Sequence, residues 1–335
     1  MTEIQKNEII FHSTYVEQCG EMQLKTWMND LQQSNPDITR VPLTCIAIPG
    51  SHDSGSYWLD KSLGVTEDES PALRFLVSKI PCIASIVYRW SKTQSQSIQQ
   101  QLENGVRYLD LRVYQHPKNK EIRIGHGLYG RRLDDVLEEV RTFLREADRE
   151  IVLLDFNHLI GIDNHQEVLN LITSKFEGKL IPPADDLTNL TLENIWNSPQ
   201  RVVVFYAAEV MNRFPSVWFG QRRIKSPWPN TTKPSHLKRF LNYNYDVDDK
   251  PGVNEFYVWQ GVLTPTYMSV VRRLWSSLEK ALVPDANPAF LDWLHDKVRG
   301  SRGINICIVD FVEKYQYVPS VLALNNDFQK RSTEI

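Results

Sequence analysis

The stretch Leu133–Phe156, LDDVLEEVRTFLREADREIVLLDF, contains the two kinds of element from which we predict the fold. Between Leu133 and Glu146, apolar residues recur every three or four positions, which is the spacing of an amphipathic helix. The run Ile151–Phe156 is apolar almost throughout, which is typical of a strand buried on both faces of a parallel sheet. A helix that leads directly into such a strand is the repeating unit of an α/β protein.

The same alternation extends in both directions along the chain. Further strand candidates are apolar runs at Leu43–Ile48, Val106–Tyr114, Glu121–Gly125, Arg201–Ala208, Glu255–Val262 and Ile304–Phe311. Segments with helical apolar spacing lie between them, at Ser95–Asn104, His165–Phe176, Thr191–Trp196, Pro265–Leu282 and Ala289–Arg299. No glycine-rich dinucleotide-binding turn follows any of these strands. The pattern therefore favours a TIM-type (β/α) barrel, irregular or incompletely closed, over a doubly wound sheet.

The length of 335 residues suits one large barrel, because α/β barrels use about 250 residues or more as a single domain. We therefore expect a single domain over residues 1–335. Residues Lys225–Pro251 are rich in Pro, Asn, Asp and aromatic side chains. This composition predicts a long structured loop between strands, or a boundary between two half-barrels.

Composition excludes several classes of partner. With 38 Lys and Arg against 41 Asp and Glu, the chain has no electrostatic signature of nucleic-acid binding. No uncharged apolar run reaches the length of a membrane span, and the acidic N-terminus MTEIQKNEIIFHS differs from a secretory signal. The four cysteines form no CxxC pair, which favours a reducing compartment without structural zinc. We expect a cytoplasmic protein with peripheral membrane contact, and no pattern indicates its oligomeric state.

Polar residues suited to catalysis first concentrate in IPGSHDSGSY, Ile48–Tyr57, directly after a predicted strand. Loops that follow the strands of a (β/α) barrel hold its active site. Gly50 and Gly55 allow a sharp turn, and His52 beside Asp53 places a titratable base next to a carboxylate. A structural or capping hydrogen bond is the alternative explanation of this pair.

Two further motifs follow in the chain. In GVRYLDLR, Gly105–Arg112, strand alternation puts Asp110 and Arg112 on one face, which predicts either a site wall or a structural ion pair. In RIGHGLYG, His126 lies between two glycines, which leave its imidazole accessible. Two histidines with an arginine are suited to in-line phosphoryl transfer, because they supply a base, an acid and a fixed cation.

The phrase IPGSHDSGS, the strand GVRYLDLR and the turn IGHG, in this order and spacing, resemble the X-box of phosphatidylinositol-specific phospholipases C. The likeness is strongest to eukaryotic proteins that contain only an X domain, and it extends to the bacterial enzymes. It implies a TIM-type barrel in which residues 41–208 carry the catalytic motifs and residues 209–335 complete the barrel. It also implies a phosphoric diester hydrolase of lipid degradation and signal transduction, which cleaves a phosphoinositide or related glycerophospholipid to diacylglycerol and a cyclic or hydrolysed inositol phosphate.

The resemblance assigns roles to the three motif residues with basic side chains. His52 matches the general base that takes the proton from the inositol 2-hydroxyl, which then attacks the adjacent phosphorus. His126 matches the general acid that protonates the departing diacylglycerol oxygen. Arg112 matches the arginine of the bacterial enzymes that contacts the phosphate.

Three carboxylates complete the catalytic set that the resemblance implies. Asp310, at the end of the last predicted strand, matches the carboxylate that orients the base. Asp53 matches the one that supports the acid. Asp110 lies within the same network, where we expect it to position Arg112 or His52.

The resemblance also bears on metal ions and substrate. Calcium-dependent members hold a carboxylate ligand where this chain has Arg112, and a glutamate where it has Phe156, before Asn157 and His158. A guanidinium keeps its proton and repels a divalent cation. We therefore expect calcium-independent catalysis without metal or cofactor, with Arg112, Asn157 and His158 as substrate-binding residues. Arg201–Ala208 lacks the basic residue that the family usually supplies for the headgroup, which weighs against a polyphosphorylated inositol.

Two other functions stay open at this point. A metal-dependent barrel enzyme of the glycerophosphodiester phosphodiesterase kind needs a Glu-x-Asp type ligand pair, where this chain has Asp110, Leu111 and Arg112. A catalytically weak lipid-headgroup binder or scaffold would keep both histidines and still turn over poorly. Assay of purified protein on phospholipid vesicles, with and without a chelator, separates these functions.

Two segments are candidates for contact with a phospholipid membrane. Ala72–Trp90 is long and apolar, and Pro215–Lys225 combines aromatic with basic residues. In the second segment the expected interfacial residues are Trp218, Phe219, Arg222 and Arg223. Core packing or a solvated loop is the alternative for both segments.

Overall fold

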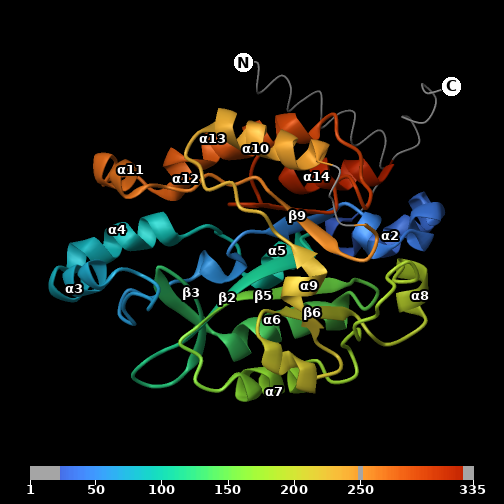
Figure 1. Ribbon diagram of the computed structural model, residues 1–335, viewed down its shortest axis with the longest axis horizontal. Coiled ribbons are helices and arrows are strands. Elements are labelled where there is room, and N and C mark those ends of the chain that lie inside the picture. Colours follow the sequence, from blue (N-terminus) through green and yellow to red (C-terminus); the bar gives the residue numbers. More distant parts are fainter. Residues whose placement is uncertain (1–22, 248–251, 327–335) are drawn as a thin grey trace.

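A computed structural model describes residues 23–247 and 252–326, which form a barrel of strands surrounded by helices (Figure 1). The main path of its sheet has the order β7–β6–β5–β2–β1–β10–β9–β8, and every pair along this path is parallel. The strands are β1 (Ile48–Ser51), β2 (Tyr108–Gln115), β5 (Val152–Ile160), β6 (Val202–Tyr206), β7 (Trp218–Phe219), β8 (Ile224–Lys225), β9 (Phe256–Gln260) and β10 (Ile306–Val309). The predicted α/β barrel class is confirmed.

Hydrogen bonds do not close the barrel all the way round. β7 and β8 lie at the two ends of the sheet order, and each is only two residues long. The one-turn helix α9 (Gly220–Arg223) joins them in sequence, and no ladder joins β7 to β8 in the described part of the chain. We call this gap the seam. The barrel is therefore incompletely closed, as predicted.

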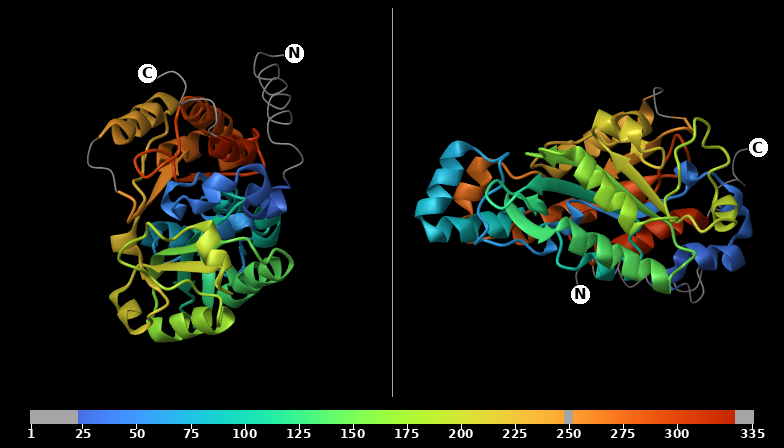
Figure 2. Two further views of the ribbon diagram at one scale, coloured as in Figure 1. Left: turned by 90° about the vertical axis from the view of Figure 1, so that its right-hand side faces the viewer. Right: turned by 90° about the horizontal axis from the view of Figure 1, so that it is seen from below.

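Helices cover the strands on the outside of the barrel (Figures 1 and 2). They are α2 (Trp27–Ser34), α3 (Pro71–Lys79), α4 (Pro81–Ser91), α5 (Ile98–Glu103), α6 (Leu133–Glu146), α7 (His165–Lys175), α8 (Leu192–Trp196), α10 (Pro234–Asp246), α11 (Tyr267–Arg272), α12 (Leu278–Ala281), α13 (Val283–Leu294) and α14 (Tyr317–Ala323). Short 3-10 helices occur at Leu24–Thr26, Pro36–Arg40, Leu43–Cys45, Ser54–Tyr57, Glu209–Arg213 and Leu324–Asn326.

Helix α6 shows how local sequence and packing agree. It has the predicted bounds, and Asp134 and Asp135 occupy its first turn, where negative charge is favourable to the helix dipole. One face is buried against the barrel, through Leu133, Val136, Leu137, Val140, Phe143 and Leu144. Burial of each such side chain contributes about 1.5–3 kcal/mol. The strands β1, β6, β9 and β10 are buried at every residue, as expected of a parallel sheet covered on both faces.

The strand predicted at Leu43–Ile48 is wrong in position. Leu43–Cys45 forms a 3-10 turn, and β1 begins only where its first N–H donates to the carbonyl oxygen of Asn305. The strand itself contains Pro49 and Gly50, which are poor strand formers. Parallel pairing with β10 and β2, rather than local propensity, therefore decides where β1 lies.

Three predictions for the second half of the chain also change. Pro265–Leu282 forms two short helices, α11 and α12, and the last predicted helix begins earlier, as α13. The loop predicted at Lys225–Pro251 contains helix α10, and its residues 248–251 lie outside the described ranges. Pro234 is the first residue of α10, a position where the missing N–H is tolerated. Buried Leu237 and Leu241, four residues apart, pack the helix onto the barrel.

A hairpin extends the sheet beyond the barrel. β2 pairs antiparallel with β3 (Ile122–His126), which pairs with β4 (Leu128–Arg132), a strand that the sequence analysis does not predict. Gly127 turns the chain between them with φ of 66°, a left-handed conformation that suits glycine. The hairpin therefore fixes where His126 lies.

Ala72–Trp90 forms α3 and α4, which lie at one end of the molecule beside α11 and α12 (Figures 1 and 2). Arg89 of α4 donates to the carbonyl oxygens of Leu274 and Ser276, between α11 and α12. These hydrogen bonds join two segments that are far apart in the chain. Among the helices of residues 23–247 and 252–326, none combines the length and apolarity that a membrane span requires.

Candidate active site

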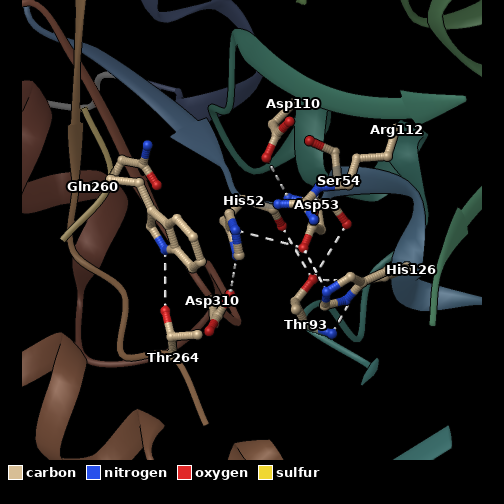
Figure 3. A network of polar contacts seen from close by, with 12 residues as sticks. His52, Asp53, Ser54, Thr93, Asp110, Arg112, His126, Gln260, Thr264 and Asp310 are labelled. Carbon is tan, nitrogen blue, oxygen red and sulfur yellow. Dashed lines mark hydrogen bonds and ion pairs between the residues drawn. The ribbon is translucent and has the colours of Figure 1, made fainter. Parts of the chain in front are cut away.

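The predicted catalytic residues come together at the C-terminal ends of the barrel strands (Figure 3). They are His52 and Asp53 directly after β1, Asp110 and Arg112 in β2, His126 at the end of β3, and Asp310 directly after β10. Active sites of (β/α) barrels lie at this edge of the sheet.

Asp310 holds the imidazole of His52. The Nδ1 atom of His52 lies 2.7 Å from Asp310 Oδ1, and it donates the hydrogen bond because a carboxylate only accepts. Its Nε2 lies 3.5 Å from Asp53 Oδ2. Burial lowers the pKa of His52, but the negative charges of Asp53 and Asp310 outweigh this effect and raise the pKa to about 9. At pH 7, His52 therefore carries its second proton.

Asp53 is the central carboxylate of the site. Its backbone is left-handed, with φ of 43°, and its side chain is buried. Oδ1 contacts Arg112 Nε, and Oδ2 lies 3.3 Å from His126 Nε2. Burial raises the pKa of Asp53, but the positive charges of Arg112, His126 and His52 hold it well below its usual range. One ionised carboxylate thus faces the Nε2 atoms of both histidines.

His126 is oriented by the main chain. Its Nδ1 lies 2.8 Å from the carbonyl oxygen of Ser91, which only accepts, so Nδ1 carries a proton and Nε2 is directed toward Asp53. The ring centroids of His52 and His126 are 6.4 Å apart. This arrangement suits one proton acceptor and one proton donor acting on the same phosphate.

Arg112 is the cation of the site. Burial lowers its pKa, but the charges of Asp53 and Asp110 raise it further above an already high value, so the guanidinium stays charged. It uses Nε for Asp53. Its terminal amino groups have no hydrogen-bond acceptor among the residues that the structure describes. They are therefore available to bind two oxygens of a phosphate.

Asp110 acts on the backbone of Asp53. Its Oδ2 accepts from the Asp53 N–H at 2.9 Å, and its Oδ1 accepts from Asn157 Nδ2 at 2.8 Å. Asp110 thus bonds to the residue next to His52, and its expected role in positioning Arg112 or His52 stays a prediction. Its hydrogen bond to Asp53 holds the left-handed turn that carries the central carboxylate.

A further buried carboxylate, Asp155, lies next to the site and is absent from the predicted catalytic set. Burial and the charge of Asp110 raise its pKa to about 7, against the opposing hydrogen bonds from Tyr108 (2.6 Å) and Asn157 (3.2 Å). The signal in the sequence is a single carboxylate within the apolar run IVLLDF. Asn157, which bonds Asp110, also pairs with exposed His158 at 2.7 Å, so these two of the three predicted substrate-binding residues lie beside the site. Their binding role stays a prediction.

The acidic segment Glu67–Glu69 is also missed. Asp68 accepts a hydrogen bond from Tyr114 of β2 at 3.0 Å. Burial and the charge of Asp68 raise the pKa of Glu69, while nearby His126 lowers it. Two neighbouring carboxylates, Asp68 and Glu69, therefore border the site on the side of the acid candidate. Their signal is the run of three acidic residues in the loop after β1.

The interfacial residues predicted within Pro215–Lys225 are largely wrong. Trp218 is 0% exposed, Phe219 packs against the same core, and Arg223 forms an ion pair with a neighbouring aspartate. Arg222 is exposed. The segment forms β7, α9 and β8 along the seam, where Trp218 is buried in the barrel and Phe219 is half-buried.

Exposed apolar side chains gather instead on α3, on α11 and on the residues that follow α11, at the end of the molecule where α4 contacts α12. Phe75 is 62% exposed, Tyr267 80% and Trp275 94%, and α3 buries none of its residues. We call this surface the apolar tip, and it consists of Phe75, Leu76, Ile80, Tyr267, Met268, Val271, Leu274 and Trp275. Contiguous exposed apolar residues mark a contact surface. Because α3 and α11 follow β1 and β9, the tip belongs to the same edge of the barrel as the site.

In the described part of the chain, one group of side chains has the spacing of a metal site. Ligand atoms of His52, Asp53 and Asp110 lie within 4.8 Å of one another. They do not suit a divalent cation, because Asp53 already faces Arg112 and a fixed guanidinium repels the ion.

Known proteins are similar to this chain in sequence. The family described as phosphatidylinositol-specific phospholipase C, X domain, matches residues 86–207. The chain is 35% identical over 309 residues to PI-PLC X domain-containing protein 2 of Mus musculus, covering 91% of this chain and 89% of that one. It is 34% identical over 315 residues to PI-PLC X domain-containing protein 3 of Homo sapiens, covering 93% of this chain and 96% of that one.

Solved structures resemble the chain in fold. Phosphatidylinositol-specific phospholipase C from Listeria monocytogenes has a TM-score of 0.59 at 20% identity, covering 90% of this chain and 99% of that one. The Staphylococcus aureus enzyme, from a study of the modulation of its membrane binding, has a TM-score of 0.58 at 16% identity, covering 90% and 97%. These likenesses show the shared barrel.

Proposed function

The chain belongs to the family of PI-PLC X domain-containing proteins, and on this premise we propose that it is a phosphoric diester hydrolase of the phospholipase C type. Its substrate is a phosphoinositide or related glycerophospholipid. The observation that carries the proposal is the geometry around Asp53, which faces Nε2 of both histidines and the guanidinium of Arg112 (Figure 3).

In the proposed reaction, His52 Nε2 takes the proton of the inositol 2-hydroxyl, and the oxygen attacks phosphorus. The bond from phosphorus to the diacylglycerol oxygen breaks, and His126 Nε2 gives this oxygen a proton. Arg112 binds the phosphate oxygens and stabilises their charge. Asp310 orients His52, and Asp53 supports the protonated form of His126. The first product is a cyclic inositol phosphate, which water opens in a second step.

This chemistry uses no metal ion. The guanidinium of Arg112 supplies the positive charge that a divalent cation would otherwise bring to the phosphate. Its terminal amino groups also present two parallel donors, which match phosphate oxygens. The proposed enzyme is therefore independent of calcium.

The headgroup that best fits the site has few or no ring phosphates. Asp68 and Glu69 add negative charge on the side of His126, and β6 is followed by Ala207 and Ala208 rather than by a basic residue. Additional phosphates on the inositol ring would meet these carboxylates and be repelled. Phosphatidylinositol itself avoids this repulsion.

Contact with a phospholipid membrane is assigned to the apolar tip. Exposed aromatic side chains partition into the interface of a bilayer, and basic side chains attract anionic headgroups. Exposed basic residues flank the tip, namely Arg74, Lys79, Arg272 and Lys280. The segment Ala72–Trp90 thus keeps its predicted interfacial role, while α11 replaces Pro215–Lys225. Peripheral attachment from the cytoplasmic side stays a prediction.

A second function, headgroup binding without turnover, is favoured by one observation. Because the pKa of His52 is about 9, the proposed base is protonated at pH 7. Protonated His52 and Arg112 together would bind an anionic phosphate but would not remove a proton. The two functions differ in whether product forms as the pH rises.

The test uses purified protein on vesicles of phosphatidylinositol, with phosphatidylcholine vesicles as control, at pH 7 and pH 9, with and without a calcium chelator. Diacylglycerol that forms from phosphatidylinositol in the presence of chelator supports the proposal. Product that requires an added metal ion supports the metal-dependent alternative. Vesicle binding without product at either pH supports the headgroup binder.

A further inference from the structure

The segment Ser91–Gln94 leads from the end of α4 into the site and has no part in the chemistry above. Thr93 and Gln94 within it are fully buried, and buried polar groups need hydrogen-bond partners. In the sequence nothing sets these two residues apart from their polar neighbours. Their partners are main-chain groups next to the proposed catalytic residues.

Gln94 hydrogen-bonds to the main chain at His52 and to the main chain around its partner Asp310. Its Nε2 donates to the carbonyl oxygen of His52 at 2.9 Å and to that of Val309 at 3.0 Å. Its Oε1 accepts from the N–H of Val312 at 3.2 Å. Val309 precedes Asp310, and Val312 follows it. The side-chain amide of Gln94 therefore holds the turn of His52 in a fixed position relative to the main chain before and after Asp310.

Thr93 holds the same turn from a second direction (Figure 3). Its Oγ1 lies 3.1 Å from the carbonyl oxygen of His52 and 3.3 Å from that of Asp53. Its N–H donates to Ser56 Oγ at 3.0 Å, and its carbonyl oxygen accepts from the N–H of Phe311 at 2.7 Å. The turn needs this support, because a left-handed backbone is disfavoured for a residue with a Cβ, such as Asp53.

The segment also reaches the second histidine. The carbonyl oxygen of Ser91 accepts from His126 Nδ1, which directs Nε2 toward Asp53. Three residues of this short segment, Ser91, Thr93 and Gln94, thus set the positions of the proposed base, the central carboxylate and the proposed acid. The base and the central carboxylate are neighbours in the turn after β1, whereas the acid comes from the end of β3.

We infer that Thr93 and Gln94 are positioning residues of the site, which hold the turn of His52 and Asp53 where proton transfer to and from the substrate is possible. They act through the main chain and touch no reacting atom. The inference rests on the proposed hydrolase function.

A matched control residue lies at the opposite end of the barrel. Asn305 is buried as well, and its Nδ2 donates to the carbonyl oxygens of Leu43 at 3.1 Å and Ile46 at 2.8 Å. Its Oδ1 accepts from the N–H of Tyr257 at 3.2 Å. This is the hydrogen-bond pattern of Gln94, but its main-chain partners lie before β1 and at the start of β9. The partners of Gln94 lie after β1 and at or beyond the end of β10.

The test compares Gln94→Met, Thr93→Val and the conservative Thr93→Ser with the control Asn305→Leu. We measure kcat and KM per folded protein on phosphatidylinositol vesicles, and the melting temperature of each variant. Gln94→Met is expected to lower kcat by about 100-fold and Thr93→Val by about tenfold, with KM little changed, because a misplacement of about 1 Å has such an effect. Thr93→Ser is expected to restore kcat. Asn305→Leu is expected to lower the melting temperature and to leave kcat unchanged.

The pH profile gives a second readout, which a merely structural role would not move. Asp310 raises the pKa of His52, so a looser turn in Gln94→Met shifts the rising limb of the profile to lower pH. Wild-type kcat and an unshifted limb in both Gln94→Met and Thr93→Val overturn the inference. An equal loss of kcat in Asn305→Leu also overturns it.

Failure of the proposed function is distinguishable from failure of this inference. If the wild-type protein forms no product, the hydrolase proposal fails, and the imidazole titration of His52 by NMR then tests the positioning role. A shift to lower pH in Thr93→Val, reversed in Thr93→Ser and absent in Asn305→Leu, supports that role. Identical titrations in all variants overturn it. Thr93→Val keeps the size of the side chain, so this arm holds even if Gln94→Met does not fold.

Discussion

At the N-terminal ends of the barrel strands, Arg107 and Glu150 form an ion pair that is fully buried. Arg107 Nε donates to Glu150 Oε2 at 2.8 Å, and its terminal amino groups donate to three main-chain carbonyl oxygens at 2.7 Å. Glu150 accepts from two backbone N–H groups of α2. At the C-terminal ends, Asp53 is equally buried, yet neither of its carboxylate oxygens accepts a protein hydrogen bond of good geometry.

The difference between the two ends separates stability from chemistry. A buried pair whose hydrogen bonds are all made contributes to the fold and offers nothing to a ligand. Asp53 is different, because it faces two histidines and an arginine without a hydrogen bond of good geometry to any of them. Its oxygens can therefore still accept hydrogen bonds during a reaction. A buried charge does not by itself mark a catalytic site. A buried charged group whose hydrogen bonds are not all made within the protein does.

Removal of a proton-transfer group is expected to have the largest effect of all, a loss of kcat. It tests whether the C-terminal end of the barrel serves catalysis rather than stability. His52→Ala and His126→Ala should each lower kcat on phosphatidylinositol vesicles by about 10²–10⁴-fold, because each loses a general base or acid. Their melting temperatures should stay near that of the wild type. His165→Ala is the control, because this histidine bonds only to Tyr206 and lies on α7. Wild-type turnover in either catalytic variant would refute the mechanism.

At the other end, Arg107→Met should reduce the free energy of unfolding by about 3–5 kcal/mol, because Glu150 is left buried without its partner. Unfolding in urea measures this loss, and kcat of the folded fraction should be unchanged. The double variant Arg107→Met with Glu150→Gln should recover part of the stability. A loss of kcat as large as that of His52→Ala would contradict the separation of the two ends.

A charge-conserving change sharpens the comparison. Arg112→Lys should lower kcat by about 10- to 100-fold, because an ammonium cannot make the two parallel hydrogen bonds to phosphate that a guanidinium makes. The wild-type rate should survive a calcium chelator. A rate abolished by the chelator and restored by calcium would show that Arg112 is not the cation of the reaction.

The pH dependence tests the charges around His52. A base must be unprotonated. The pKa of His52, about 9, lies above the usual value of 6.5, so the limb of the kcat/KM profile that reports this base should lie above pH 7. Asp310→Asn removes a negative charge that raises this pKa, and should move the rising limb to lower pH while lowering the maximum rate. A wild-type limb near pH 6.5 would show that the carboxylates do not control His52.

The smallest effect is expected at the apolar tip. Phe75→Ser combined with Trp275→Ser should weaken binding to phosphatidylinositol vesicles by about fivefold, because less apolar surface enters the interface. Turnover of dispersed monomeric substrate should stay the same. Tyr243→Ser is the control, since this exposed aromatic lies on α10 and outside the tip. Equal losses on vesicles and on monomers would place the tip residues in the site instead.

Elements with a strong local signal could be predicted from the sequence, and those set by distant contacts could not. Helix α6 has a regular apolar face and an acidic first turn, so its bounds follow from local sequence. β1 contains Pro49 and Gly50, and only its neighbours in the sheet make it a strand. Trp218 shows the same limit, because aromatic and basic residues close in sequence suggest a membrane surface while packing along the seam buries the ring.

The candidate site divides in the same way. His52, Arg112 and His126 stand in motifs next to strand ends, so both their residue type and their location follow from the sequence. Gln94 and Asp155 act through partners that are far away in the chain, such as the main chain around Asp310. An uncharged polar residue gives no pattern that separates a buried hydrogen-bond hub from a residue on the surface.

The seam has a consequence for variation in chain length. Between Gly220 and Arg223 the chain passes from one edge of the sheet to the other without a ladder hydrogen bond across the gap. Additional residues inserted here would break no strand pairing, and loop-closure entropy grows by only about 0.6 kcal/mol for each doubling of a loop. The proposed division into residues 41–208 and 209–335 falls just before this point. Residues can thus be inserted between the two parts of the barrel without a change in the register of the sheet.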